Sequence, residues 1–218
     1  MSIEKYVMNV QERGTGENHR KMVNKAAEIF LGYDLDAIAK KVDIKTDENY
    51  LYIDMLTRRY RISRKDGSIV WSEDGFVHCI EAGFSEAMTI YDLIAYSKEG
   101  AKASGEYTQI KNLADTLTGS YYAGKSMIDS TAFDFDGKEK ALAKACESLD
   151  GVPYGRGDVS YKIPLWRDLY TVISFWSADE EFPPQLVIML DMNMKDFIHY
   201  ETMWYLEGYL MNLIKSRL

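Results

Sequence analysis

The sequence contains few of the residues that build covalent cross-links and metal sites. Its 218 residues include only two cysteines, Cys79 and Cys146, and three histidines. Two thiols cannot make a disulfide framework or a four-thiolate metal site, and no Cys-x-x-Cys pair is present. His19 and His199 have no partner at a metal-ligand spacing. We therefore expect no metal and no other cofactor.

Long hydrophobic runs are also absent. The longest plain apolar run is the five residues 186–190, whereas a membrane-spanning helix needs about 20. The first 14 residues lack the apolar core of a signal peptide. Both absences argue against membrane insertion and secretion, so we expect a cytoplasmic protein.

The charge balance disfavours one class of partner. The chain has 26 Lys and Arg against 34 Asp and Glu, a formal net charge of −8. Duplex binding requires cationic side chains that neutralise phosphate, and we therefore expect no nucleic-acid partner.

One basic cluster runs against this balance. Five cations occur within eight residues, namely Arg58, Arg59, Arg61, Arg64 and Lys65. They could form a surface for anions or single-stranded nucleic acid, in which Tyr60 would stack on bases. They could also be the solvated face of an edge strand, charged to prevent pairing with other sheets. The acidic remainder of the chain favours the second interpretation.

The hydrophobic pattern changes its period along the chain, which indicates both helices and strands. A helical period is found in residues 17–31, 35–39, 84–95, 141–149 and 200–217. Apolar residues alternate or form short runs in 51–55, 60–62, 68–71, 159–163, 169–176 and 185–190. Strands grouped together, with helices between the groups, favour an α+β fold in which antiparallel sheets pack with helices.

The composition fits one hydrophobic core. Hydrophobic residues make up 46% of the chain, and a compact chain of this length buries ~70% of its unfolded surface. We predict a single compact domain over residues 1–218. Its parts are N-terminal helices at 17–41, a meander at 43–80, a helical middle at 84–150, and C-terminal strands with a closing helix at 158–218.

Three local motifs predict where elements begin or turn. Asp34 precedes a short apolar period and can cap a helix. Asp66-Gly67 lies between two strand patterns and predicts a hairpin turn, because both residues tolerate positive φ. Asp136-x-x-Glu139 resembles a capping box ahead of the helix at 141–149.

Residues 119–126, Gly-Ser-Tyr-Tyr-Ala-Gly-Lys-Ser, match the pattern of a phosphate-binding P-loop. That chemistry needs a buried strand entering the loop and a helix leaving it. The flanking residues 109–118 and 127–136 show neither pattern, and two adjacent tyrosines would crowd a phosphate. We therefore favour a glycine-bounded turn over a nucleotide site.

An acidic segment near two tryptophans is the strongest candidate site. Three carboxylates precede an aromatic ring and two prolines, which stiffen the loop because they restrict φ. Carboxylates beside indoles can have raised pKa values and can act as acid or base. The alternative is a solvated hairpin tip. The candidate ligand-binding residues are Trp166, Trp176, Asp179, Glu180, Glu181, Phe182, Asp191 and Glu201.

The same region resembles a known family. The sequence resembles the domain of unknown function numbered 3786 at four places. These are residues 158–166 (Asp-Val-Ser-Tyr-Lys-Ile-Pro-Leu-Trp), residues 178–184 (Ala-Asp-Glu-Glu-Phe-Pro-Pro), Met-Leu-Asp at 189–191, and Glu201. The resemblance is specific over 158–218, and the N-terminal half is similar in element order alone. It implies an anaerobic bacterial or archaeal source. Some relatives carry a four-cysteine iron–sulfur segment, which this sequence lacks.

These observations support three functional hypotheses. The first is an accessory or ligand-binding domain, whose small-molecule or protein partner contacts the surface of Trp166, Trp176 and residues 179–184. The resemblance links it to anaerobic one-carbon or corrinoid metabolism. The second is an enzyme that uses Asp179, Glu180, Asp191 or Glu201 as acid and base. The third is nucleotide binding at 119–126. Whether the chain is an enzyme is left open.

Overall fold

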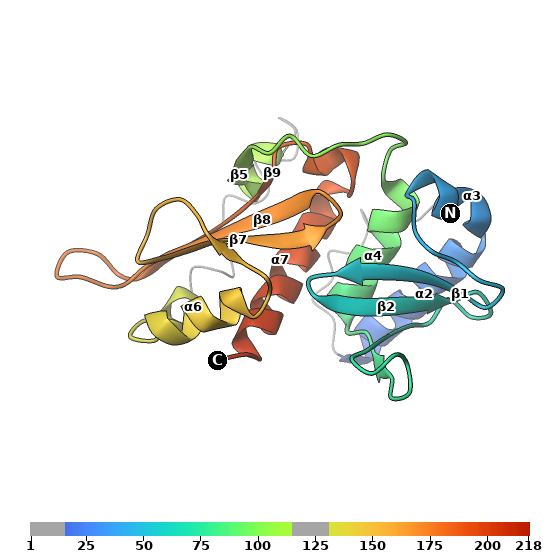
Figure 1. The fold of residues 1–218 in the computed structure, drawn as a ribbon, viewed down its shortest axis with the longest axis horizontal. Helices are drawn as coiled ribbons and strands as arrows, with labels where there is room; N and C mark the ends of the chain where they lie inside the picture. Colours follow the sequence, from blue (N-terminus) through green and yellow to red (C-terminus); the bar gives the residue numbers. More distant parts are fainter. Residues whose placement is uncertain (1–15, 115–130) are drawn as a thin grey trace. The chain divides into compact units, whose positions relative to one another are not determined.

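The protein is described by a computed structural model over residues 16–114 and 131–218. The chain divides into two compact units. Within the described residues, the first unit contains 16–101 and 195–209, and the second contains 102–114, 131–194 and 210–218. Each unit has its own antiparallel sheet (Figure 1). The predicted α+β class is confirmed, and the single domain over 1–218 stays a prediction.

The first unit is a four-stranded meander with helices before and after it. Its strand order is β1-β2-β3-β4, which confirms the meander predicted at 43–80. The helices are α2 (Gly16–Leu31), α3 (Leu35–Lys41) and α4 (Phe84–Tyr96). The strands are β1 (Tyr50–Met55), β2 (Arg58–Ser63), β3 (Ile69–Ser72) and β4 (Ile80–Glu81).

Two of the predicted local motifs in this unit are confirmed. Asp34 caps α3, because its side-chain oxygen accepts a hydrogen bond from the Ala37 N–H at 3.0 Å. The turn between β2 and β3 contains Gly67 with a φ of +74°. A Cβ at Gly67 would lie 2.9 Å from the Cβ of Ala27 in α2. Glycine is therefore required there both for its φ and for the close approach of the helix.

The second unit is a five-stranded antiparallel sheet in the order β5-β9-β8-β7-β6. The three long strands agree with the predicted ones. The elements are β5 (Tyr107–Gln109), α6 (Glu139–Glu147), β6 (Val152–Pro153), β7 (Val159–Trp166), β8 (Leu169–Trp176) and β9 (Gln185–Asp191). Short 3-10 helices lie at Ile110–Leu113 and Ala132–Asp134. The closing helix α7 (Tyr200–Lys215) belongs to the first unit up to residue 209 and to the second beyond it.

The structure corrects one boundary and adds three strands. Asp136 does not cap α6, because the residue before the helix is Lys138, which makes no side-chain cap. The Asp136 carboxylate instead accepts a hydrogen bond from the Ala178 N–H at 3.0 Å. The strands β4, β5 and β6 have only two or three residues each. A segment this short cannot display the alternation on which strand prediction depends.

Candidate ligand-binding face of the second sheet

The two predicted tryptophans end different strands, Trp166 in β7 and Trp176 in β8, and lie at opposite ends of the hairpin that these strands form. Trp166 pairs with Leu169 at the start of β8, and Trp176 pairs with Gln185 at its end. The eight residues of β8, at ~3.3 Å each, keep these ends roughly 20 Å apart. Trp166 is buried, whereas 37% of Trp176 is exposed. The two indoles therefore do not share one binding surface.

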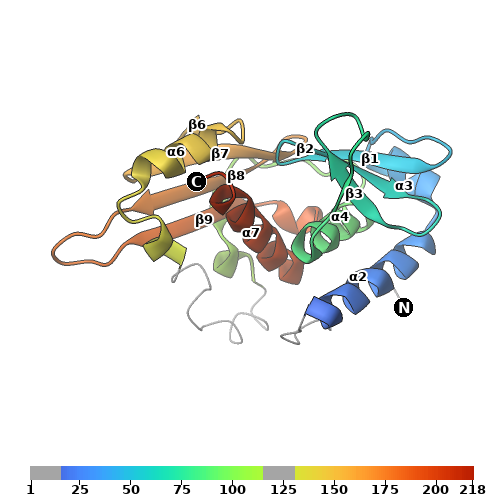
Figure 2. The same cartoon turned by 90° about the horizontal axis from the view of Figure 1, so that it is seen from below.

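The acidic loop between β8 and β9 has an exposed tip closed by its own residues, while the N–H groups of Ser177 and Ala178 at its base donate hydrogen bonds to Asp158 and Asp136. It covers residues 177–184 and extends beyond the strands in both views (Figures 1 and 2). Asp179 Oδ1 accepts hydrogen bonds from the N–H groups of Glu181 (2.8 Å) and Phe182 (2.7 Å). The side chains of Glu180, Glu181 and Phe182 are exposed. These are the properties of a solvated hairpin tip, and ligand binding by this loop stays a prediction.

Asp191 has a structural position at the other end of β9. Its side chain is fully buried. The carboxylate accepts hydrogen bonds at 2.9 Å from the Ser104 N–H, the Ser104 hydroxyl, the Gly105 N–H and the Asn193 N–H. These bonds occupy both oxygens and attach the segment before β5 to the end of β9. The side chain therefore orders the backbone and does not face an opening.

The proposed acid–base carboxylates are not gathered in one place. Asp179 and Glu180 lie before β9, and Asp191 ends that strand. The extended strand β9, of seven residues with Asp191 as the last, keeps the two positions apart. Glu201 is half-buried in the first turn of α7, within the first unit. In the described part of the second unit, these residues provide no pair of contacting carboxylates.

The basic cluster does not lie on an edge strand. Its strand β2 pairs with β1 on one side and with β3 on the other. The edge-strand interpretation is therefore wrong, because an internal strand has no unpaired backbone to protect. Sequence could not reveal this, since the position of a strand in a sheet depends on pairing between distant segments.

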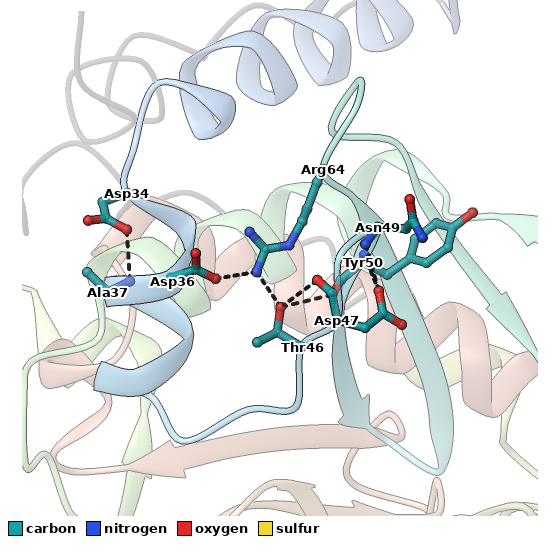
Figure 3. A network of polar contacts seen from close by, with 8 residues as sticks. All are labelled: Asp34, Asp36, Ala37, Thr46, Asp47, Asn49, Tyr50 and Arg64. Atoms are coloured by element: carbon teal, nitrogen blue, oxygen red, sulfur yellow. Dashed lines mark hydrogen bonds and ion pairs between the residues drawn. The ribbon is translucent and has the colours of Figure 1, made fainter.

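Three arginines of the cluster form ion pairs. Their partners are Glu86 for Arg58, Asp54 for Arg59 and Asp36 for Arg64. Arg64 also donates a hydrogen bond to the Thr46 hydroxyl (Figure 3). The Arg61 guanidinium lies 4.4 Å from the ring centre of Tyr50 and 4.7 Å from that of Phe76. The carboxylates compensate much of the positive charge that an anionic ligand would require.

A buried polar cluster in the first unit was missed by the sequence analysis. Glu86 of α4 accepts hydrogen bonds from Arg58 (2.5 Å), from the Tyr60 hydroxyl (2.9 Å) and from the Gly83 N–H (2.6 Å). The hydroxyls of Tyr60 and Tyr209 are 2.5 Å apart. Burial raises the pKa of Tyr60 and raises that of Tyr209 to about 12. Both phenols therefore stay neutral at physiological pH and act as hydrogen-bonding groups inside the core.

A second buried pair joins α4 to the start of α7. The Asp92 carboxylate lies 2.6 Å from His199 Nδ1 and accepts a hydrogen bond from the His199 N–H at 2.8 Å. Both side chains are buried. One signal was present in the sequence, because Glu86 and Asp92 interrupt an otherwise largely apolar helix. Their partners lie far along the chain and could not be inferred from it.

The two faces of the second sheet differ in burial. Along β7, buried residues alternate with half-buried ones. The buried face packs against α6, and the Tyr161 hydroxyl donates a hydrogen bond to Glu147 of that helix at 2.9 Å. Phe135 contacts Phe175 on this face, with ring centres 6.2 Å apart. Lys162 lies on the opposite face, where the β7 side chains are half-buried and the β8 residues Val172 and Ser174 are buried.

On this opposite face, three tyrosines from separate segments surround one lysine. Tyr107 and Tyr154 meet edge to face, with ring centres 5.8 Å apart and an interplanar angle of 78°. The Lys162 ammonium lies 5.7 Å from the ring centre of Tyr154 and 4.6 Å from that of Tyr170. We call these four residues the tyrosine face. Tyr154 is 42% exposed, and the other three are half-buried.

The polar atoms of the tyrosine face are available to a ligand. In the described part of the chain, the three hydroxyls and the Lys162 ammonium make no hydrogen bond or ion pair. Burial and the charge of Asp191 raise the pKa of Tyr107, so its hydroxyl stays a donor at neutral pH. The face therefore presents three hydroxyls and one ammonium that make no polar contact within the described residues.

Comparison with known families assigns the chain to one of them. The family described as a domain of unknown function (DUF3786) matches residues 34–213. The chain belongs to this family. The match includes most of the first unit as well as the second, and it is therefore wider than the specific resemblance seen at 158–218. No curated protein and no solved structure matches the chain significantly.

The described residues of this DUF3786 chain contain neither a metal-binding cluster nor a membrane-spanning helix. Over 16–114 and 131–218, no three His, Cys, Asp or Glu side chains gather as metal ligands would. No helix in the same ranges is long and apolar enough to cross a membrane. The P-loop match at 119–126 lies outside the described residues.

The two cysteines should react very differently with thiol reagents. Cys79 is exposed and Cys146 is fully buried in α6. Burial raises the pKa of the Cys146 thiol to about 12, and only the thiolate is nucleophilic. At pH 8 we expect Ellman's reagent to modify one thiol per native chain and two in denaturant, with Cys79→Ser removing the native reaction. Two rapid equivalents from native protein would contradict this assignment.

Proposed function

We propose that the chain is a non-catalytic ligand-binding domain that holds a small molecule on the tyrosine face. The observation that carries the proposal is the set of four side chains, Tyr107, Tyr154, Lys162 and Tyr170, whose polar atoms have no protein partner in the described residues. Polar groups on a half-buried surface normally find partners within the protein or in the solvent. Here a bound molecule would supply them.

The position of the face favours binding over catalysis. It lies on a sheet whose other side packs against α6; Tyr107 and Tyr170 belong to strands of this sheet, and Tyr154 directly follows β6. None of its four residues is a carboxylate or a histidine that could serve as general base, and the nearby Asp191 carboxylate already accepts four hydrogen bonds. The link to anaerobic one-carbon or corrinoid metabolism stays a prediction that rests on the family resemblance.

The test is a fragment series followed by amide NMR on the full chain. Neutral, cationic and anionic fragments, both aromatic and aliphatic, are titrated separately. We expect at least one class to shift the amide signals of residues 107, 154, 162 and 170, with the dissociation constant rising ~10-fold in Tyr154→Ala. Tyr154 makes no hydrogen bond through its hydroxyl in the described residues, so its removal should leave the fold intact.

Tyr52→Ala in β1 is the matched control, because this tyrosine lies in the other sheet. Fragment binding should be unchanged in that variant. The proposal is wrong if no fragment of any charge shifts the amides of the tyrosine face, or if binding survives Tyr154→Ala with the same constant.

A further inference from the structure

We infer that the ligand of the tyrosine face is a flat ring that carries a negatively charged group. This inference rests on the proposed function and narrows it to one chemical class. It follows from two separate features of the face, namely an uncompensated ammonium and the arrangement of the rings around it.

The charge requirement follows from Lys162. Its ammonium lies over the rings of Tyr154 and Tyr170, and no carboxylate forms an ion pair with it in the described residues. Cation–π contacts attract the ammonium but do not neutralise its charge. In a chain with 34 acidic residues, a half-buried lysine without a carboxylate partner is best complemented by an anion from outside.

One nearby carboxylate must be considered. Asp191 is close enough for its charge to influence Tyr107. However, it accepts hydrogen bonds from three backbone N–H groups and one hydroxyl. These donors offset its negative charge locally, and they belong to the segment at 104–105 and to Asn193. The Asp191 carboxylate is therefore committed to the backbone and leaves Lys162 for a ligand.

The ring requirement follows from the tyrosines. Tyr107 and Tyr154 stand at 78° to one another, so one ring edge meets one ring face. A third planar group can stack on an exposed face in this geometry, since aromatic pairs prefer offset-stacked or edge-to-face contacts. Tyr154 exposes 42% of its surface, and Tyr170 lies on the other side of the lysine. A ring with an attached carboxylate or phosphate would stack on the tyrosines and form an ion pair with the Lys162 ammonium.

The test compares three probes that separate charge from ring. Benzoate has both features, benzamide has the ring without the charge, and cyclohexanecarboxylate has the charge without the aromatic ring. We expect benzoate to bind ~10-fold more tightly than either, as judged from the amide shifts of residues 107, 154, 162 and 170. Lys162→Met should weaken benzoate ~10-fold and Lys162→Arg should retain binding. Lys144→Met, an exposed lysine of α6, should change nothing.

Each outcome of these titrations supports or overturns one part of the inference. Equal binding of benzamide and benzoate, or unchanged benzoate binding in Lys162→Met, would overturn the anionic class while leaving ligand binding at the face intact. Equal binding of cyclohexanecarboxylate and benzoate would overturn the requirement for an aromatic ring. If benzoate does not shift the face at all, the inference is wrong, and the neutral and cationic fragments then show whether the proposed function is wrong as well.

Discussion

Replacing Glu86 with alanine should destabilise the first unit by ~3–5 kcal/mol, the cost expected when one partner of a buried ion pair is removed. The Arg58 and Glu86 side chains are only 19% and 11% exposed. The substitution leaves the Arg58 guanidinium without its carboxylate and deprives the Tyr60 hydroxyl and the Gly83 N–H of their acceptor. The buried Tyr60 hydroxyl and the half-buried Arg58 guanidinium then have to find other partners where water has little access.

The neighbouring arginine provides a matched control. Arg59 follows Arg58 in β2 and pairs with Asp54, but these two side chains are 61% and 66% exposed. Asp54→Ala should therefore cost no more than ~1 kcal/mol, as is usual for exposed pairs. Chemical denaturation with amide hydrogen exchange in β2 and α4 measures both effects in the full chain. Similar losses in the two variants would show that Glu86 is not an internal anchor.

Replacing Asp191 with alanine should destabilise the second unit by ~3 kcal/mol or more, because four hydrogen bonds to a buried carboxylate are lost together. The orphaned donors are the N–H groups of Ser104, Gly105 and Asn193 and the Ser104 hydroxyl. Amide hydrogen exchange should accelerate at these three residues and at Tyr107. Since Tyr107 pairs with Asp191 across β5 and β9, ligand binding at the tyrosine face should also weaken.

Asp179→Ala is the control for this experiment. Asp179 also accepts backbone hydrogen bonds, from Glu181 and Phe182, but in an exposed loop at the other end of β9. Water can replace these bonds, so the loss should stay below ~1 kcal/mol. An Asp191→Ala variant as stable as Asp179→Ala would contradict the structural role. The comparison also measures whether the acidic loop matters for stability.

Much of the local structure followed from the sequence. The helical period of 17–31 and 84–95, the alternation of 51–55 and the turn at Asp66-Gly67 correspond to α2, α4, β1 and the turn between β2 and β3. These signals are local, because a period of apolar residues or a residue that tolerates positive φ is contained in one short segment. The short strands were missed for the same reason, since two or three residues display no period.

The candidate site shows where local reasoning fails. Trp166 and Trp176 are ten positions apart in the sequence, but the extended strand β8 between them places them at opposite ends of the β7–β8 hairpin. Asp191 is a candidate catalytic acid by residue type, but its buried carboxylate accepts four hydrogen bonds and orders the backbone. Three of the four donors belong to Ser104 and Gly105, which are far from it in the sequence, and only the Asn193 N–H is near.

The sequence by itself determined the α+β class, the order of the main helices and strands, and the family, because these depend on periodicity and on residue patterns along the chain. Only the tertiary structure decided which side chains meet. Strand pairing brings Tyr107, Lys162 and Tyr170 to one face of the second sheet, and Tyr154 joins them directly after β6. Pairing between distant strands depends on the whole chain, and so no single segment carries the signal of this face.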